Sequence, residues 1–235
     1  EEVARIRNIM LGAYEIGGFN VKSKDWFDAI SEKINLLKKV EDYIRDNLRI
    51  KDGKLQVATR IVSNVSNLVH EMQKERGITA AYIGSNGQKF EKELQEQRDN
   101  TDMRFDVLDA YLAIVDYSAS SEDFQDNLHL SMSTLKKLND VRNEITMLNI
   151  NAEEAISYYS QVNALFLETI SSVIKMASNK YEANDLSAFY YFLMTKASTA
   201  VQLVGLIMSG FTSISLMTSD KSAAILEKLL RASAT

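Results

Sequence analysis

The residue with the clearest capacity for binding chemistry is Arg76, in the segment LVHEMQKERG (residues 68–77). Apolar residues recur around it at the three- and four-residue spacing of one helix face: Ala58, Val62, Val65, Val69, Met72, Ala80 and Ile83. At about 100° per residue, Arg76 falls within about 20° of Val69, on this face, whereas Glu75 points elsewhere. A guanidinium keeps its charge, so a core-facing arginine needs an anion or hydrogen-bond acceptors. No carboxylate lies on the same face, so the partner comes from another helix or from a ligand.

Two further arginines, Arg98 and Arg142, also lie on apolar helix faces. Asp102 follows Arg98 by four residues, so an intrahelical ion pair is expected there. The acids next to Arg142 face away, which favours an ion pair with another helix. Three core-facing arginines would nevertheless make a positive interior that suits a planar anion. Tyr159 lies on the inward face of its own helix, where its hydroxyl contacts a ligand or is satisfied within the core.

Other classes of site are not indicated by the sequence. The chain has no cysteine and only two histidines, without the spacing of a metal site. No glycine-rich phosphate loop follows a strand, and no serine has the histidine and acid needed for nucleophilic catalysis. We therefore expect neither an enzyme nor a bound cofactor or metal.

The elements that position these residues are expected to be helices throughout. Proline is absent, glycine is scarce and 46% of the residues are hydrophobic, which suits long helices. The periodicity and turn signals predict helices at residues 1–16, 25–48, 55–83, 89–117, 120–148, 152–176, 184–210 and 219–231. Asn151 and Glu154 form a capping pair for the sixth of these. The predicted fold class is all-α, an elongated helical bundle with both chain ends at the same end.

Charge and hydropathy narrow the partners and the setting. The net charge of −5 offers no basic footprint for nucleic acid. No apolar run reaches the length of a membrane span, and no signal peptide is visible. The chain begins within a helical pattern, so we expect a single domain, residues 1–235, cut from a longer protein.

The segment LVHEMQKERGITAAYIGSNG resembles the signature of the NIT family, the nitrate- and nitrite-sensing domains of bacterial receptors and regulators. The resemblance continues through residues 90–102, 138–142 and 152–159, and more loosely through 196–211. It covers about residues 55–211 and leaves residues 1–54 unmatched.

This resemblance implies an architecture, a setting and a role for Arg76. It implies two stacked four-helix bundles, in the extracytoplasmic (periplasmic) part of a membrane-anchored, homodimeric chemoreceptor or sensor kinase. It also implies that Arg76 binds the anion. The further candidate ligand-binding residues are Arg142, Arg98, Tyr159 and Lys196. The rival reading is a helical protein-interaction or scaffolding module whose buried arginines are ion-paired and which has no small ligand.

The sequence departs from the family pattern at the second anion-binding arginine. NIT domains commonly show KE-x2-G-x-ER late in the chain, and the corresponding segment here begins at Lys196. Gln202 and Leu203 stand where the Glu-Arg pair is expected. An apolar wall opposite Arg76 favours an anionic head with an apolar or neutral tail. We therefore predict that a small carboxylate binds better than nitrate.

Overall fold

The computed structural model describes residues 23–48, 50 and 53–211, and side chains of residues 23–27, 29–30 and 197–211 fall outside the description. Its helices are α2 (Ser23–Asp46), α3 (Gly53–Gly84), α4 (Glu91–Ile114), α5 (Glu122–Leu135), α6 (Leu138–Thr146), α7 (Ala152–Ile174) and α8 (Lys180–Phe211). No strand occurs in these ranges, so the predicted all-α class is confirmed. Among these residues, no helix combines the length and apolar character that a membrane crossing requires.

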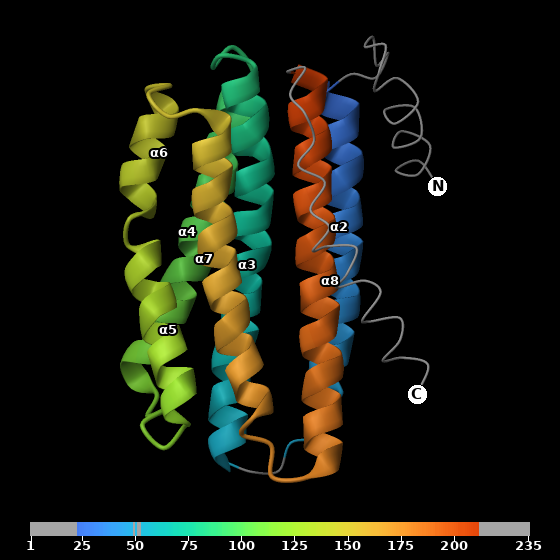
Figure 1. The fold of residues 1–235 in the computed structure, drawn as a ribbon, viewed down its shortest axis with the longest axis vertical. Helices are drawn as coiled ribbons and strands as arrows, with labels where there is room; N and C mark the ends of the chain where they lie inside the picture. Colours follow the sequence, from blue (N-terminus) through green and yellow to red (C-terminus); the bar gives the residue numbers. More distant parts are fainter. Residues whose placement is uncertain (1–22, 49, 51–52, 212–235) are drawn as a thin grey trace.

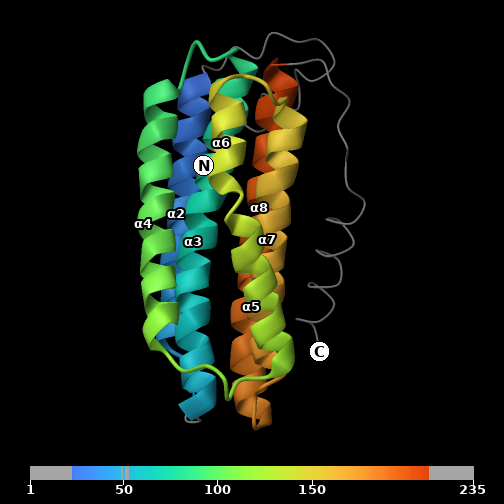
Figure 2. The same ribbon diagram turned by 90° about the vertical axis from the view of Figure 1, so that its left-hand side faces the viewer.

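The helices run along the long axis of an elongated bundle (Figures 1 and 2). Helices α3, α4 and α7 form one group with α5 and α6, which follow one another along the same edge. Helices α2 and α8 lie together beside this group, against α3 and α7. The chain direction places α7 antiparallel to α3 and α8 parallel to it (Figure 1).

Helix α3 is the central element, because it packs against α2, α4, α7 and α8. The predicted apolar stripe is buried, apart from the half-buried Ile83. The expectation of a single buried face is too narrow, however, because polar residues on the other faces, including Glu71 and Glu75, are buried as well. A helix surrounded on several sides has no free face, so its polar residues must find partners inside the protein.

Two helix starts follow local sequence chemistry. The Asn151 side chain accepts from the backbone N–H of Glu154 at 2.9 Å, and the Glu154 carboxylate accepts from that of Asn151 at 3.2 Å, which confirms the capping box. Ser121 caps α5 by accepting from the N–H of Phe124.

Two departures from the predicted helices exceed the shifts of up to three residues at the other helix ends. Helix α8 begins at Lys180 rather than at residue 184, because Asn179 accepts from the backbone N–H groups of Tyr181 and Glu182 and acts as the cap. The expected single helix over residues 120–148 is divided into α5 and α6 by a turn at Lys136 and Lys137. No glycine or proline marks this break in the sequence.

Several expectations fall on residues outside the described ranges. These are the helices predicted at 1–16 and 219–231, the position of the chain ends and the side chains of Gln202 and Leu203. The pair α2 and α8 lies alongside the α3–α7 group, and the prediction of two stacked four-helix bundles stays a prediction.

Candidate functional site

Arg76 is buried in the core with most of its hydrogen-bonding capacity unused. Its side chain is 2% exposed, and its Nη1 donates to Ser160 Oγ of α7 at 3.1 Å. Within the part of the chain that the structure describes, the buried Nε and Nη2 atoms have no hydrogen-bond partner. No described carboxylate forms an ion pair with it, and burial lowers the pKa of its guanidinium to about 10. Arg76 remains a cation at neutral pH, with donors left for an anion.

Two other buried side chains, one helical turn from Ser160 and from Arg76, also have unpaired polar atoms. Asn163, on α7 one turn after Ser160, is 3% exposed, and neither its Oδ1 nor its Nδ2 has a partner. Gln73, on α3 one turn before Arg76, is 2% exposed and its Oε1 is unpaired. Buried polar atoms without partners are rare in folded proteins, so their occurrence within one helical turn of Arg76 and Ser160 makes this stretch of α3 and α7 a candidate binding site.

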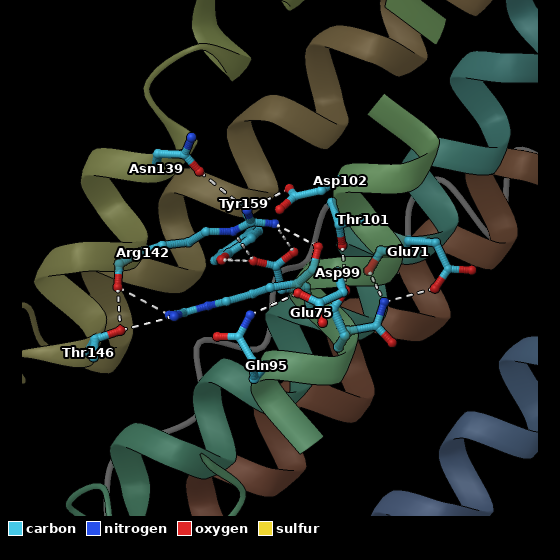
Figure 3. Close-up of polar contacts among 12 residues, drawn as sticks. Glu71, Glu75, Gln95, Asp99, Thr101, Asp102, Asn139, Arg142, Thr146 and Tyr159 are labelled. Carbon is cyan, nitrogen blue, oxygen red and sulfur yellow. Dashed lines mark hydrogen bonds and ion pairs between the residues drawn. The ribbon is translucent and has the colours of Figure 1, made fainter. Parts of the chain in front are cut away.

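Arg142 has the opposite environment. Its Nε and Nη2 donate to the two carboxylate oxygens of Glu75 at 2.7 and 2.9 Å, and its Nη1 donates to Asp102 at 2.6 Å (Figure 3). Burial lowers the pKa of Arg142, but the hydrogen bonds and charge of Glu75 outweigh this effect and raise it. The expected ion pair with another helix is confirmed, since Glu75 lies on α3 and Asp102 on α4.

Tyr159 belongs to the same network. Its hydroxyl donates to Glu75 Oε1 at 2.7 Å, from the α7 side (Figure 3). Burial, followed by the charge of Glu75, raises the pKa of Tyr159 well above its ordinary value. The hydroxyl is therefore protonated and already used within the core, which is the satisfied alternative considered for this residue.

The expected ion pair between Arg98 and Asp102 is wrong. Arg98 donates from Nη1 to Thr146 Oγ1 at 2.9 Å and from Nη2 to the Arg142 backbone oxygen at 3.1 Å. Asp102 is taken by Arg142 instead. Arg98 thus joins α4 to α6 and does not reach its own helical neighbour, although its buried Nε is unpaired.

Lys196 is 1% exposed and pairs with the fully buried Glu41 of α2. Burial lowers the pKa of Lys196, and the charge of Glu41 works against that effect. Ser66 and Lys38 also donate to Glu41, so this cluster joins α2, α3 and α8. This cluster is separate from the Glu75 network. Of the five predicted ligand-binding residues, Lys196 and Arg142 are therefore ion-paired within the protein.

The structure thus divides the predicted residues. Arg142, Tyr159 and Arg98 meet around Glu75 and α6, Lys196 lies on Glu41, and Arg76 faces Ser160. Sequence reasoning missed Glu75, Glu41, Ser160, Asn163 and Gln73. Only Asn163 carried a signal, because it continues the inward face of Tyr159 and Phe166. In the part of the chain that the structure describes, no group of three acidic or histidine side chains is placed to hold a metal ion.

A comparison with protein-family models matches residues 67–233 to the family described as nitrate and nitrite sensing, NIT. The chain belongs to the NIT family. The match begins one residue before the predicted signature and extends beyond residue 211, where the resemblance in the sequence ended. Residues 68–84 of the signature lie on α3. Within this NIT domain, Arg76 is the arginine of the signature.

The fold of this NIT domain also occurs in a solved structure titled "Structure of the NasR transcription antiterminator". The two share 19% sequence identity at a TM-score of 0.59, over 74% of this chain and 45% of that one. This chain therefore spans less than half the length of that protein. A comparison with curated proteins finds no match.

Proposed function

We propose that this NIT domain is a ligand-binding sensor domain in which Arg76 holds a small anion between α3 and α7. The observation that carries the proposal is the state of Arg76 itself: it is buried, has one neutral hydrogen-bond partner and has no ion-pair partner among the described residues. A buried guanidinium without a counter-ion is costly, and an anion that accepts from Nε and Nη2 removes that cost.

The rival function, a helical interaction module without a small ligand, requires buried arginines that are all ion-paired. Arg142 fits that description, because Glu75 and Asp102 occupy all three of its nitrogens. Arg76 does not fit it. This difference between two buried arginines favours a sensor over a scaffold.

The setting of the domain is part of the same proposal. We place it in the extracytoplasmic part of a membrane-anchored, dimeric receptor, such as a chemoreceptor or sensor kinase, with no catalysis and no nucleic-acid contact of its own. The support is the NIT family match together with the chain's net negative charge. Fractionation of cells that express the full-length parent tests this point, and a protein recovered wholly in the soluble cytosolic fraction would overturn it.

The ligand class follows from the size of nitrate and from the residue pattern. An ion of four heavy atoms gains at most about 6 kcal/mol, at about 1.5 kcal/mol per atom, which corresponds to tens of micromolar. Reaching that ceiling needs charged donors on more than one side, and the resemblance to the family pattern puts Leu203 at the position of the second family arginine. We therefore propose a small carboxylate as the preferred ligand, with nitrate and nitrite as weaker ones.

A thermal-shift and calorimetry panel tests the site. Nitrate, nitrite and short carboxylates are titrated into the wild-type protein and into Arg76→Gln, with Arg60→Gln as the control on the exposed side of the same helix. At a ligand concentration 100 times Kd, the wild type and the control should gain about 2.7 kcal/mol of stability. Arg76→Gln should gain nothing. Equal binding by Arg76→Gln and the wild type would refute the proposal.

A further inference from the structure

Asn163 has a buried amide with both polar atoms unpaired, which the anion proposal alone does not explain. Its Oδ1 and Nδ2 are both inaccessible, and both lack partners among the residues that the structure describes. As the amide is placed, Oδ1 accepts no hydrogen bond and Nδ2 donates none within the described part of the chain. The site therefore contains one unused acceptor and one unused donor.

The helix register places Asn163 toward Arg76. On α7, Tyr159 and Ser160 both contact α3, and Asn163 lies between them in angle, about 40° from Tyr159. Because α7 is antiparallel to α3, Asn163 lies about 5 Å from Ser160 in the direction of the α3 N-terminus. Side chains tilt toward the N-terminus of their own helix. The Arg76 side chain therefore extends toward the α3 N-terminus, to the level of Asn163, and the Asn163 side chain extends toward Ser160.

The acceptor atom distinguishes between ligand classes. Nitrate, nitrite and acetate only accept hydrogen bonds, so they can pair with Arg76 and with Asn163 Nδ2 but leave Asn163 Oδ1 unpaired. Gln73 Oε1 is a second buried acceptor without a partner, one turn from Arg76 on α3. Two acceptors call for a ligand that donates. A neutral O–H or N–H supplies that donor without adding a second positive charge beside Arg76.

We infer that Asn163 is a specificity-determining contact and that the ligand is a small carboxylate carrying a neutral hydrogen-bond donor, a hydroxycarboxylate being the simplest case. This inference rests on the proposed anion site at Arg76. The carboxylate is held by Arg76 and Ser160, and the hydroxyl donates to Asn163 Oδ1.

Acetate and glycolate form the decisive pair of probes, because they carry the same charge and differ by one hydroxyl. Calorimetry on the wild-type protein should give a Kd for glycolate at least about tenfold lower than for acetate, since leaving a buried acceptor unpaired costs that much or more. In Asn163→Leu the ratio of the acetate Kd to the glycolate Kd should fall to about one, with acetate still bound. Asn35→Leu, an exposed asparagine on α2, should keep the wild-type ratio.

The outcomes separate the two claims. Arg76-dependent binding of both probes without a glycolate preference, or with nitrate as the tightest anion, overturns the inference and leaves the anion site standing. Binding that does not depend on Arg76, or no binding of any probe, overturns the proposed function. Asn163→Leu removes two unpaired polar atoms, so its Tm should not fall. If it does not fold, the wild-type ratio and the smaller change Asn163→Ala, which should also bring that ratio to about one, decide the matter.

Discussion

Two neighbouring residues of α3 build two different buried polar regions. Glu75 faces Tyr159 and Arg142 and is completely satisfied, whereas Arg76 faces Ser160 and is not. The contacts on α7 are neighbours as well, Tyr159 and Ser160. Burial is nearly equal in both regions, so burial by itself does not distinguish a structural charge from a binding charge. The distinguishing property is whether the protein itself supplies the opposite charge.

The two regions have different roles: one holds the helices together and the other carries the unpaired groups. The Glu75 network fixes α3, α4, α6 and α7 relative to one another through charge-assisted hydrogen bonds (Figure 3). Such a frame holds the backbone on which Arg76, Ser160 and Asn163 are placed. A rigid frame allows the adjacent unpaired groups to persist without collapsing onto protein partners.

The largest effect is expected from removing the cation of the satisfied region. Arg142→Met leaves Glu75 buried and fully inaccessible without its counter-ion, which should cost about 3–5 kcal/mol of unfolding free energy. Urea denaturation followed by circular dichroism measures this. The double variant Arg142→Met, Glu75→Gln should regain most of the loss. A single-variant loss below about 1 kcal/mol would show that Glu75 does not depend on Arg142.

A smaller loss is expected from the third member of the network. Tyr159→Phe removes a hydrogen bond to a charged carboxylate and should cost about 1.5–3 kcal/mol in the same denaturation experiment. Tyr158→Phe is the matched control, because its hydroxyl donates to the neutral backbone oxygen of Thr134. It should cost about 0.5–1.5 kcal/mol. Equal losses in the two variants would contradict a charged network at Tyr159.

His70 extends the comparison to a buried group that can give up its charge. Burial, helped by the charges of Lys196 and Lys74, lowers the pKa of His70 to about 2, against about 6.5 in the unfolded chain. Between these values the unfolded state binds the proton and the folded state does not. Stability should therefore fall as the pH drops below about 6.5, by about 1.4 kcal/mol per pH unit. Denaturation at pH 7.5 and 5.5 should show a smaller fall in His70→Gln, and an identical fall would exclude His70 as its source.

The smallest change in unfolding free energy, and one of opposite sign, is expected from replacing Arg76. Arg76→Met in the absence of ligand leaves no carboxylate of the described residues unpaired and removes a buried, incompletely bonded cation. Its unfolding free energy should rise by about 1 kcal/mol. A loss of several kcal/mol would mean that Arg76 is a structural charge like Arg142, and the contrast between the two regions would fail.

The sequence by itself determined the local features of this protein. The helical class, the buried stripe of α3, the capping box at Asn151 and the NIT signature were all readable, because they depend on residues within a few turns of one another. The core position of Arg76 was readable for the same reason. The cap at Asn179 was also local, and it was missed because the later Asn184 appeared an equally good start.

Only the tertiary structure decided the partners of the buried charges. Asp102 lies four residues after Arg98 and yet binds Arg142, 40 residues away along the chain. Glu75 and Glu41 became the counter-ions of Arg142 and Lys196 through contacts 67 and 155 residues apart. These pairings depend on the rotation and register of whole helices against one another, which the periodicity of any single helix does not contain. For that reason the sequence could place Arg76 in the core, but only the packing of α3 on α7 showed that no carboxylate of the described residues pairs with it.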